Sequence, residues 1–180
     1  MKLVRYGQPG KEKPGLIDAE GKLRDLSGVV TDIGPAQLSP KSLAKLAKLK
    51  TDTLPLVRGK PRMGIPFTGA TKFVAIGLNY SDHAAETGAE PPAEPILFSK
   101  SPNTLVGPFD DVTIPRGSVK TDWEVELGIV IGTRASYLAD EQAATAAIAG
   151  YTLVNDVSER AFQLERGGQW SKGKSAATFN

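Results

Sequence analysis

The sequence predicts an α+β fold in which a mostly β portion carries the chemistry. Two observations favour this class. Short apolar runs bounded by Gly, Pro and polar residues, at residues 73–78, 96–98 and 112–114, are typical of buried strands. Two segments, residues 39–50 and 139–148, have the apolar spacing and the end residues of helices. Strands therefore dominate, with a few short helices between them.

The first third of the chain differs in texture from the rest. Short strand-like pieces broken by glycines fill residues 1–30, and the helix predicted at residues 39–50 follows them. Proline and glycine then recur through residues 55–66, as in a linker. We therefore predict a small N-terminal α/β domain with its linker over residues 1–65, and a catalytic domain over residues 66–180.

The composition excludes several classes of protein and of site. With 22 basic and 20 acidic residues, the formal charge of +2 lacks the clustered basic excess of a nucleic-acid binder. The chain has no cysteine and a single histidine, His83, so thiolate sites, cysteine nucleophiles and multi-histidine metal sites are excluded. We expect any metal to be held mainly by carboxylates. No apolar run of about 18 residues and no signal-peptide pattern occurs, so we expect a cytoplasmic protein without a membrane partner.

The strongest chemical signal lies in residues 123–131. On a strand, alternate side chains share a face, so Glu124 and Glu126 lie side by side on one face. The opposite face is apolar and consists of Val125, Leu127, Ile129 and Ile131. Two adjacent carboxylates repel each other, and Mg²⁺, Mn²⁺ or Ca²⁺ removes that repulsion. A strand with one solvated face explains the spacing equally well, but the apolar second half of the strand favours a covered metal site.

A second polar segment, residues 155–163, directly follows a predicted strand. If the chain turns helical there, Asp156, Arg160 and Gln163 share one stripe. Asp156 then supplies a third carboxylate, and Arg160 and Gln163 hold an anionic, oxygen-rich substrate. The alternative is a helix cap, with Asp156 as the N-cap and Glu159 three residues later. The sequence leaves both interpretations open.

Two further segments carry groups suited to catalysis. His83 and Glu86 are three residues apart, which places an imidazole and a carboxylate on one face of a short helix. Such a pair forms a general base for water, although it is more often an ordinary surface pair. Lys174 lies in the glycine-containing residues 166–175, which formally match a phosphate-binding loop. We reject that match because no strand precedes it, and a solvated loop is the simpler interpretation.

In this order, these segments resemble the fumarylacetoacetate hydrolase family. The matching motifs are residues 76–80 followed by His83, then residues 124–128, 155–160 and 173–175. Residues 5–7 and 15–18 resemble the small N-terminal domain of a bacterial subgroup of the family. The resemblance covers nearly the whole chain, and four motifs in the same order are highly specific.

The resemblance implies a mixed β-roll fold, a homodimer and a role for each singled-out residue. These roles are metal ligands for Mg²⁺ or Mn²⁺ (Glu124, Glu126 and Asp156), a base that activates water (His83 with Glu86), a cation over the substrate oxyanion (Lys174) and substrate contacts (Arg160 and Gln163). It also implies a C-terminal portion, missing after Asn180, with further strands and a Thr-Gly-Thr-Pro segment. Family members commonly have Asp where this sequence has Ala177.

The expected reaction follows from this resemblance. Within the family, the long N-terminal part and residues 119–123 resemble bacterial sugar-acid enzymes, such as 2,4-diketo-3-deoxy-L-rhamnonate or fuconate hydrolases, whose relatives are often labelled ureidoglycolate lyase. The implied activity is hydrolysis of a C–C bond in an acylpyruvate-type 2,4-diketo acid, through a metal-stabilised enolate, to pyruvate and a carboxylic acid. The alternatives are a lyase, decarboxylase or isomerase acting on ureidoglycolate, oxaloacetate or a hydroxydienoate, or a non-catalytic module that binds a metal or an acid.

Overall fold

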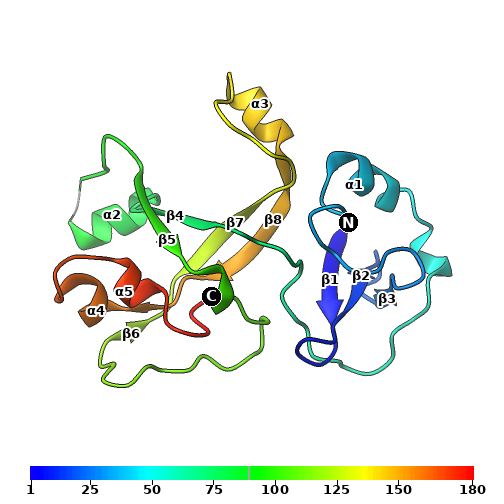
Figure 1. Ribbon diagram of the computed structural model, residues 1–180, viewed down its shortest axis with the longest axis horizontal. Coiled ribbons are helices and arrows are strands. Elements are labelled where there is room, and N and C mark those ends of the chain that lie inside the picture. Colours follow the sequence, from blue (N-terminus) through cyan, green and yellow to red (C-terminus); the bar gives the residue numbers. More distant parts are fainter. Residues whose placement is uncertain (89) are drawn as a thin grey trace. The chain divides into compact units, whose positions relative to one another are not determined.

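The computed structural model describes residues 1–88 and 90–180, and Figure 1 shows its helices and strands. The chain divides into two compact units. Unit 1 comprises Met1–Gly69, Val106–Asp111 and Val125–Val154, and unit 2 comprises Ala70–Leu105, Val112–Glu124 and Asn155–Asn180. Within the described residues, every helix is too short or too polar to cross a membrane. The domain boundary expected after residue 65 stays a prediction.

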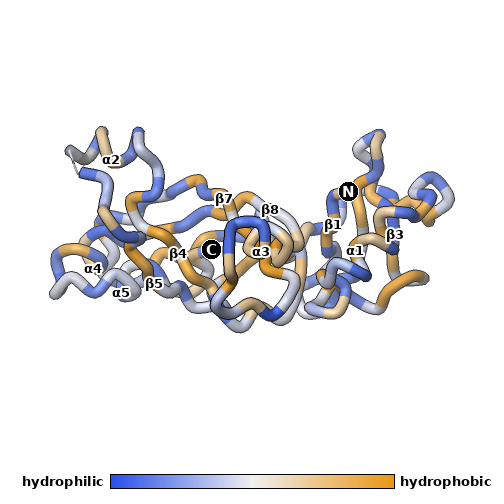
Figure 2. Tube along the Cα trace, turned by 90° about the horizontal axis from the view of Figure 1, so that it is seen from above, coloured by the Kyte–Doolittle hydropathy of each residue, from blue (hydrophilic) through white to orange (hydrophobic). Residues whose placement is uncertain are grey.

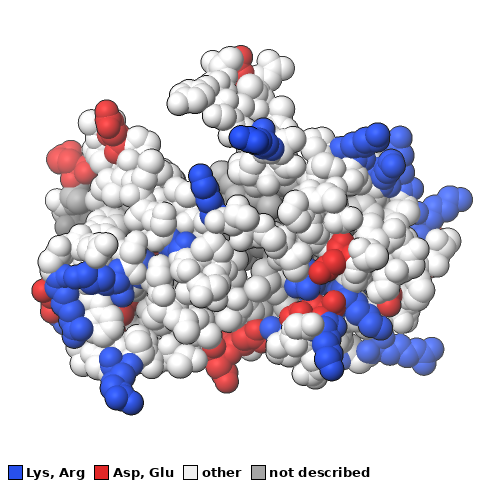
Figure 3. Space-filling view, viewed as in Figure 1, with Lys and Arg blue, Asp and Glu red and all other residues white. Residues whose placement is uncertain are grey.

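Unit 1 begins with a three-stranded antiparallel sheet in the order β1-β2-β3, followed by a short helix and a 3₁₀ turn. Its first elements are β1 (Lys2–Tyr6), β2 (Lys13–Ile17), β3 (Leu23–Asp25), α1 (Pro40–Leu46) and η1 (Thr51–Thr53). The core of this part consists of Tyr6, Leu16, Leu26, Ile33 and Leu46. The helix is shorter than predicted because the bonds after Leu46 tighten: Lys48 N–H donates to the Lys45 carbonyl rather than four residues back. The lysines of this helical segment face solvent, where basic side chains gather over α1 (Figure 3).

Unit 1 also contains a strand pair whose connection carries a helix. Its elements are β7 (Val125–Ile131), α3 (Glu141–Ala146) and β8 (Ile148–Asn155). The helix predicted over residues 139–148 is too long at its C-terminal end. Gly132 N–H donates to the Ala147 carbonyl at 2.9 Å, so pairing with β7 takes over there, and Gly150 lies inside β8 instead of ending the helix. At its N-terminal end the helix begins two residues later than predicted, at Glu141, because Asp140 caps it by accepting a hydrogen bond from Ala143 N–H.

The strand β7 shows the alternation that the sequence predicts. Val125, Leu127, Ile129 and Ile131 are all more than half exposed, whereas the residues between them are half-buried. In β4, by contrast, apolar residues follow one another along the strand (Figure 2). Glu126 on β7 and Glu124 just before it therefore lie on the more buried face of the strand.

Unit 2 combines two strand pairs with short helices. Its elements are β4 (Phe73–Gly77), α2 (Ser81–Thr87), β5 (Ile96–Lys100), η2 (Pro102–Thr104), β6 (Thr121–Asp122), β9 (Ser158–Glu159), α4 (Arg160–Leu164) and α5 (Ser171–Lys174). Strands β4 and β5 pair antiparallel, as do β6 and β9. The strand predicted at residues 112–114 does not form. Thr113 N–H donates instead to the Thr178 hydroxyl at 2.7 Å, so a side chain takes the place of a partner strand.

The buried part of unit 2 is unusually polar. Alongside the apolar Ala84, Val157, Ala161 and Phe179, it buries Lys100, Thr104, Asp156, Ser158, Glu159, Gln163 and Lys174. Buried charges are uncommon unless they are paired, and each one requires specific partners. The burial pattern alone therefore points to the surroundings of Asp156 as the functional part of this unit.

Glu159 anchors the start of α4. The helix begins at Arg160, and Glu159 is its N-cap, accepting a hydrogen bond from Ala161 N–H. The predicted cap, with Asp156 as the N-cap and Glu159 inside the helix, is therefore wrong. The fully buried Glu159 carboxylate also accepts bonds from Lys120 N–H and from the hydroxyls of Ser118 and Thr121. Burial raises the pKa of the Glu159 carboxyl, but these bonds outweigh it and hold the pKa below its usual value.

The substitution Glu159→Gln tests this anchor. The amide of the variant keeps one oxygen acceptor, but its NH₂ group faces groups that are themselves donors. We therefore expect the free energy of unfolding at pH 7 to fall by about 1–3 kcal/mol. Urea denaturation followed by circular dichroism measures the difference. Because folding lowers the carboxyl pKa, the carboxylate contributes fully above its unfolded value near 4.5, and this contribution is lost as the pH falls further. The deficit should therefore shrink below that pH, and a deficit independent of pH contradicts the anchor.

Candidate metal centre

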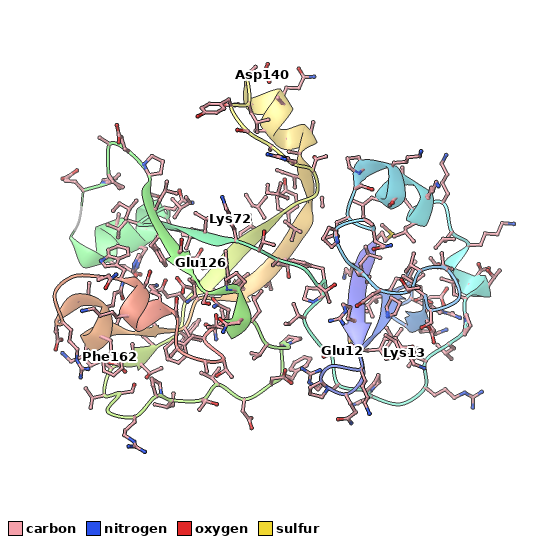
Figure 4. All side chains as sticks on the ribbon, in the orientation of Figure 1. Glu12, Lys13, Lys72, Glu126, Asp140 and Phe162 are labelled. Carbon is pink, nitrogen blue, oxygen red and sulfur yellow. The ribbon has the colours of Figure 1, made fainter. Side chains whose placement is uncertain are left out.

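Three carboxylates converge where β7 begins and β8 ends. Glu124 immediately precedes β7, Glu126 is its second residue, and Asp156 follows β8. The Asp156 N–H donates to the Glu124 carbonyl at 2.9 Å, which fixes the two backbones beside each other. One carboxylate oxygen from each of the three residues lies within 4.8 Å of the others. Figure 4 labels Glu126 on β7.

This donor set fits a hard divalent cation. Mg²⁺ binds oxygen at about 2.0–2.1 Å and Ca²⁺ at about 2.3–2.6 Å, so oxygens around one ion lie roughly 3–5 Å apart. The separation within 4.8 Å is compatible with that spacing. Carboxylate oxygens without nitrogen or sulfur donors suit Mg²⁺, Mn²⁺ or Ca²⁺ better than softer metals. Asp156 is buried and both glutamates are half-buried, so the three groups also need a positive charge nearby.

Lys174 supplies one such charge. Its ammonium donates to Glu124 Oε1 at 2.9 Å and to Asp156 Oδ2 at 2.7 Å, and the residue is buried. Gly173 makes this placement possible, because a Cβ atom at that position would lie 2.5 Å from the Glu159 carbonyl oxygen. The glycine therefore lets α5 approach β9 closely enough for the lysine to reach the carboxylates. The interpretation of residues 166–175 as a solvated loop is wrong for the C-terminal end of this segment. There the chain forms α5, and Lys174 is buried.

Lys100 is a second cation, which the sequence did not reveal as a site residue. It is the last residue of β5, its side chain is fully buried, and its ammonium bonds Asp156 Oδ1 and the Val157 carbonyl. Burial lowers the pKa of the Lys100 ammonium, and the Asp156 carboxylate opposes that effect. One sequence signal could have found it. Ile96, Phe98 and Lys100 alternate along one strand, so a lysine occupies a position that points inward.

Arg160 completes the positive side of the site. Its guanidinium pairs with Glu124 and binds Asp122 Oδ2 through two nitrogens, at 2.8 and 3.1 Å. Burial works against ionisation of Asp122, but the bonds from Arg160 lower the pKa of its carboxyl. Arg160 also donates to the buried Gln163 at 3.1 Å. These two residues lie one helical turn apart on α4, as expected, whereas Asp156 lies outside that helix.

Ser158 adds a neutral donor to the site. Its buried hydroxyl lies 3.1 Å from Glu124 Oε1 and 3.1 Å from the Asp156 carbonyl oxygen. It therefore links two of the acidic residues. No sequence pattern marks Ser158 as a site residue, because a serine after a strand is common in turns.

His83 and Glu86 lie on α2, one turn apart, and both are exposed. Leu78, the residue immediately after β4, has φ of +49°, a left-handed conformation that is rare without glycine and costs of order 1 kcal/mol or more. This turn redirects the chain from β4 into the segment that begins α2. Backbone strain of this kind clusters at functional sites. The role of His83 with Glu86 as a base stays a prediction.

Comparison with known proteins places the chain in a family. The family model described as fumarylacetoacetate (FAA) hydrolase, C-terminal, matches residues 72–180. A Burkholderia multivorans protein that carries the provisional name of hydrolase is 55% identical over 179 residues, covering 99% of this chain and 63% of that protein. The chain thus spans 63% of the length of each of three such relatives.

Solved structures share its fold. The fumarylacetoacetate hydrolase from psychrophilic Exiguobacterium antarcticum matches with a TM-score of 0.77 and 29% identity, over 99% of this chain and 63% of that structure. A 2-hydroxyhepta-2,4-diene-1,7-dioate isomerase from Mycobacterium marinum matches with a TM-score of 0.67 and 27% identity, over 99% and 62%. The chain belongs to the fumarylacetoacetate hydrolase family.

Proposed function

We propose that the protein is a metal-dependent hydrolase of a 2,4-diketo acid of the acylpyruvate type, cleaving it to pyruvate and a carboxylic acid. The observation that carries this proposal is the convergence of Glu124, Glu126 and Asp156 beside the ammonium of Lys174. Such a site suits an anionic substrate rich in oxygen. We propose further that this diketo acid is a catabolite of a deoxy sugar acid, because parts of the sequence resemble bacterial sugar-acid enzymes.

The metal would be held by the three carboxylates, with Mg²⁺ as the first choice and Mn²⁺ or Ca²⁺ as alternatives. When bound, it supplies Lewis-acid polarisation of the substrate's carboxylate and 2-oxo oxygens. Lys174, which lies beside two of the three carboxylates, would stabilise the negative charge that develops on the 2-oxo oxygen as the bond breaks, and such fixed charges contribute strongly to catalysis. Arg160 and Gln163 hold polar groups of the substrate at the edge of the site.

His83, oriented by Glu86, would act as the base. It takes one proton from a water molecule, and the resulting hydroxide attacks the C4 carbonyl carbon. The C3–C4 bond then breaks, its electron pair moves toward the 2-oxo oxygen, and C3 finally receives the proton that His83 took from water, which gives pyruvate and restores the base. The other product is the carboxylic acid formed at C4. Atoms and charge balance with water as the only co-substrate.

Isomerisation of a hydroxydienoate is a second candidate. The solved structure from Mycobacterium marinum, which shares this fold over 99% of the chain, is titled an isomerase of that class. The same acidic cluster and Lys174 could stabilise charge on the 2-oxygen while a proton moves between carbons, without breaking a C–C bond. The two reactions differ in one product, because only hydrolysis releases pyruvate.

Incubation with Mg²⁺ and acetylpyruvate tests the proposed reaction. We expect loss of the enol absorbance together with an equal amount of pyruvate, detected with a coupled dehydrogenase. Loss of absorbance without pyruvate on a hydroxydienoate substrate supports the isomerase instead. Metal binding without turnover on any diketo acid in a panel contradicts the hydrolase assignment.

The substitution Glu126→Gln tests the metal ligands. Loss of one carboxylate charge should weaken Mg²⁺ binding by more than about tenfold, whereas His83→Ala should leave the affinity within about twofold. Isothermal titration calorimetry of the two variants provides the comparison. Equal and unchanged affinities remove the metal assignment.

The substitution His83→Ala tests the base. General-base catalysis contributes about 10²–10⁴-fold, so we expect turnover to fall by at least about a hundredfold while Mg²⁺ affinity is retained. Pyruvate release under saturating Mg²⁺ measures it, and Glu86→Gln should cause a smaller loss of the same kind. Unaltered turnover in His83→Ala means that another group prepares the water.

A further inference from the structure

The two oxygens of Asp156 are held by two different lysines. Oδ1 bonds the ammonium of Lys100, and Oδ2 accepts from the ammonium of Lys174 at 2.7 Å. All three side chains are almost completely buried. A carboxylate bonded in this way has little freedom to rotate, because rotation would break both charged hydrogen bonds.

The two lysines differ in what else they bind. Lys100 bonds one backbone acceptor, the Val157 carbonyl, at 3.1 Å, and its side chain is fully buried. Lys174 bonds a second carboxylate, Glu124, through Oε1 at 2.9 Å. Its ammonium thus lies between two of the three groups that converge, where a cation would find its oxygens.

From these contacts we propose that Lys100 is a positioning residue for the metal centre. It fixes Asp156 Oδ1 and thereby presents Oδ2 as the oxygen that binds the metal. Lys174, by contrast, competes with the metal for Asp156 Oδ2 and Glu124 Oε1 and must give way to it. This inference rests on the metal centre of the proposed function and adds opposite roles for two lysines on one carboxylate.

Simple electrostatics predicts a different outcome, and this makes the two lysines a sharp test. Each ammonium repels a divalent cation nearby, so on charge alone the loss of either lysine tightens metal binding. If Lys100 positions Asp156, its loss frees the carboxylate to turn both oxygens toward Lys174. Metal binding then weakens although the site has become more negative. The sign of the change therefore separates positioning from charge.

The experiment compares Lys100→Met and Lys174→Met, with Lys72→Met as the control. Lys72 is an exposed lysine next to Phe73, the strand partner of Lys100, so the control removes the same charge from the surface instead of from a buried position (Figure 4). Mn²⁺ binding to each purified chain is titrated by calorimetry, with bound Mn²⁺ followed by electron paramagnetic resonance. We expect Lys100→Met to weaken Mn²⁺ affinity by about tenfold or more, in line with residues that orient metal ligands. Lys174→Met should strengthen it at least about threefold, and Lys72→Met should leave it unchanged.

A second substitution at the same position covers loss of folding. Thermal unfolding of each variant is recorded first. Lys100→Gln retains a donor for Asp156 Oδ1 without the charge, and we expect its affinity to lie within about threefold of the native value. A native chain that binds no Mn²⁺ overturns the proposed metal centre itself. If the native chain binds Mn²⁺, two results overturn the positioning role alone. One is unchanged or tighter Mn²⁺ binding in a folded Lys100→Met variant. The other is a loss of Mn²⁺ affinity of tenfold or more in Lys100→Gln. Unchanged or weaker binding in Lys174→Met overturns the competition.

Discussion

Crowding of like charges is the constraint on which this site depends. Oxygens of Glu124, Glu126 and Asp156 lie within 4.8 Å of one another, and Asp156 is buried. Removing carboxylates from water in this way is costly unless opposite charges compensate them. Lys100, Lys174 and Arg160 reach these groups from β5, α5 and α4, so three separate elements are arranged around one acidic cluster. A divalent cation would add to that compensation.

The polar interior of unit 2 explains how short elements hold these charges in place. Glu159 lies at the N-terminus of α4, and its carboxylate is satisfied by backbone and hydroxyl donors from residues 118–121. This fixes both the start of α4 and the strand pair β6–β9, and with them the neighbouring Arg160. Gly173 then allows α5 to pack against the same region. The positions of the two cations on α4 and α5 therefore follow from contacts outside the acidic cluster.

Local patterns in the sequence predicted much of this arrangement. The alternation in β7 placed Glu124 and Glu126 on one face, and the strand runs at β4 and β5 are confirmed. Contacts between distant residues account for the failures. Pairing with β7 shortens the second predicted helix, and residues 112–114 bind the Thr178 side chain instead of a strand. Lys100 was missed because a lysine at the end of an apolar run is usually exposed, and only its partner, 56 residues later in the sequence, explains its burial.

The most direct test of the central claim is to locate a cation. Crystals of the protein grown with Mn²⁺ would be measured for anomalous scattering at a wavelength where manganese scatters strongly. The account predicts an anomalous peak bonded to oxygens of Glu124, Glu126 and Asp156, with coordination distances typical of Mn²⁺–oxygen bonds. Crystals saturated with Mn²⁺ whose anomalous peaks all lie elsewhere would contradict the assignment of these carboxylates as a metal centre.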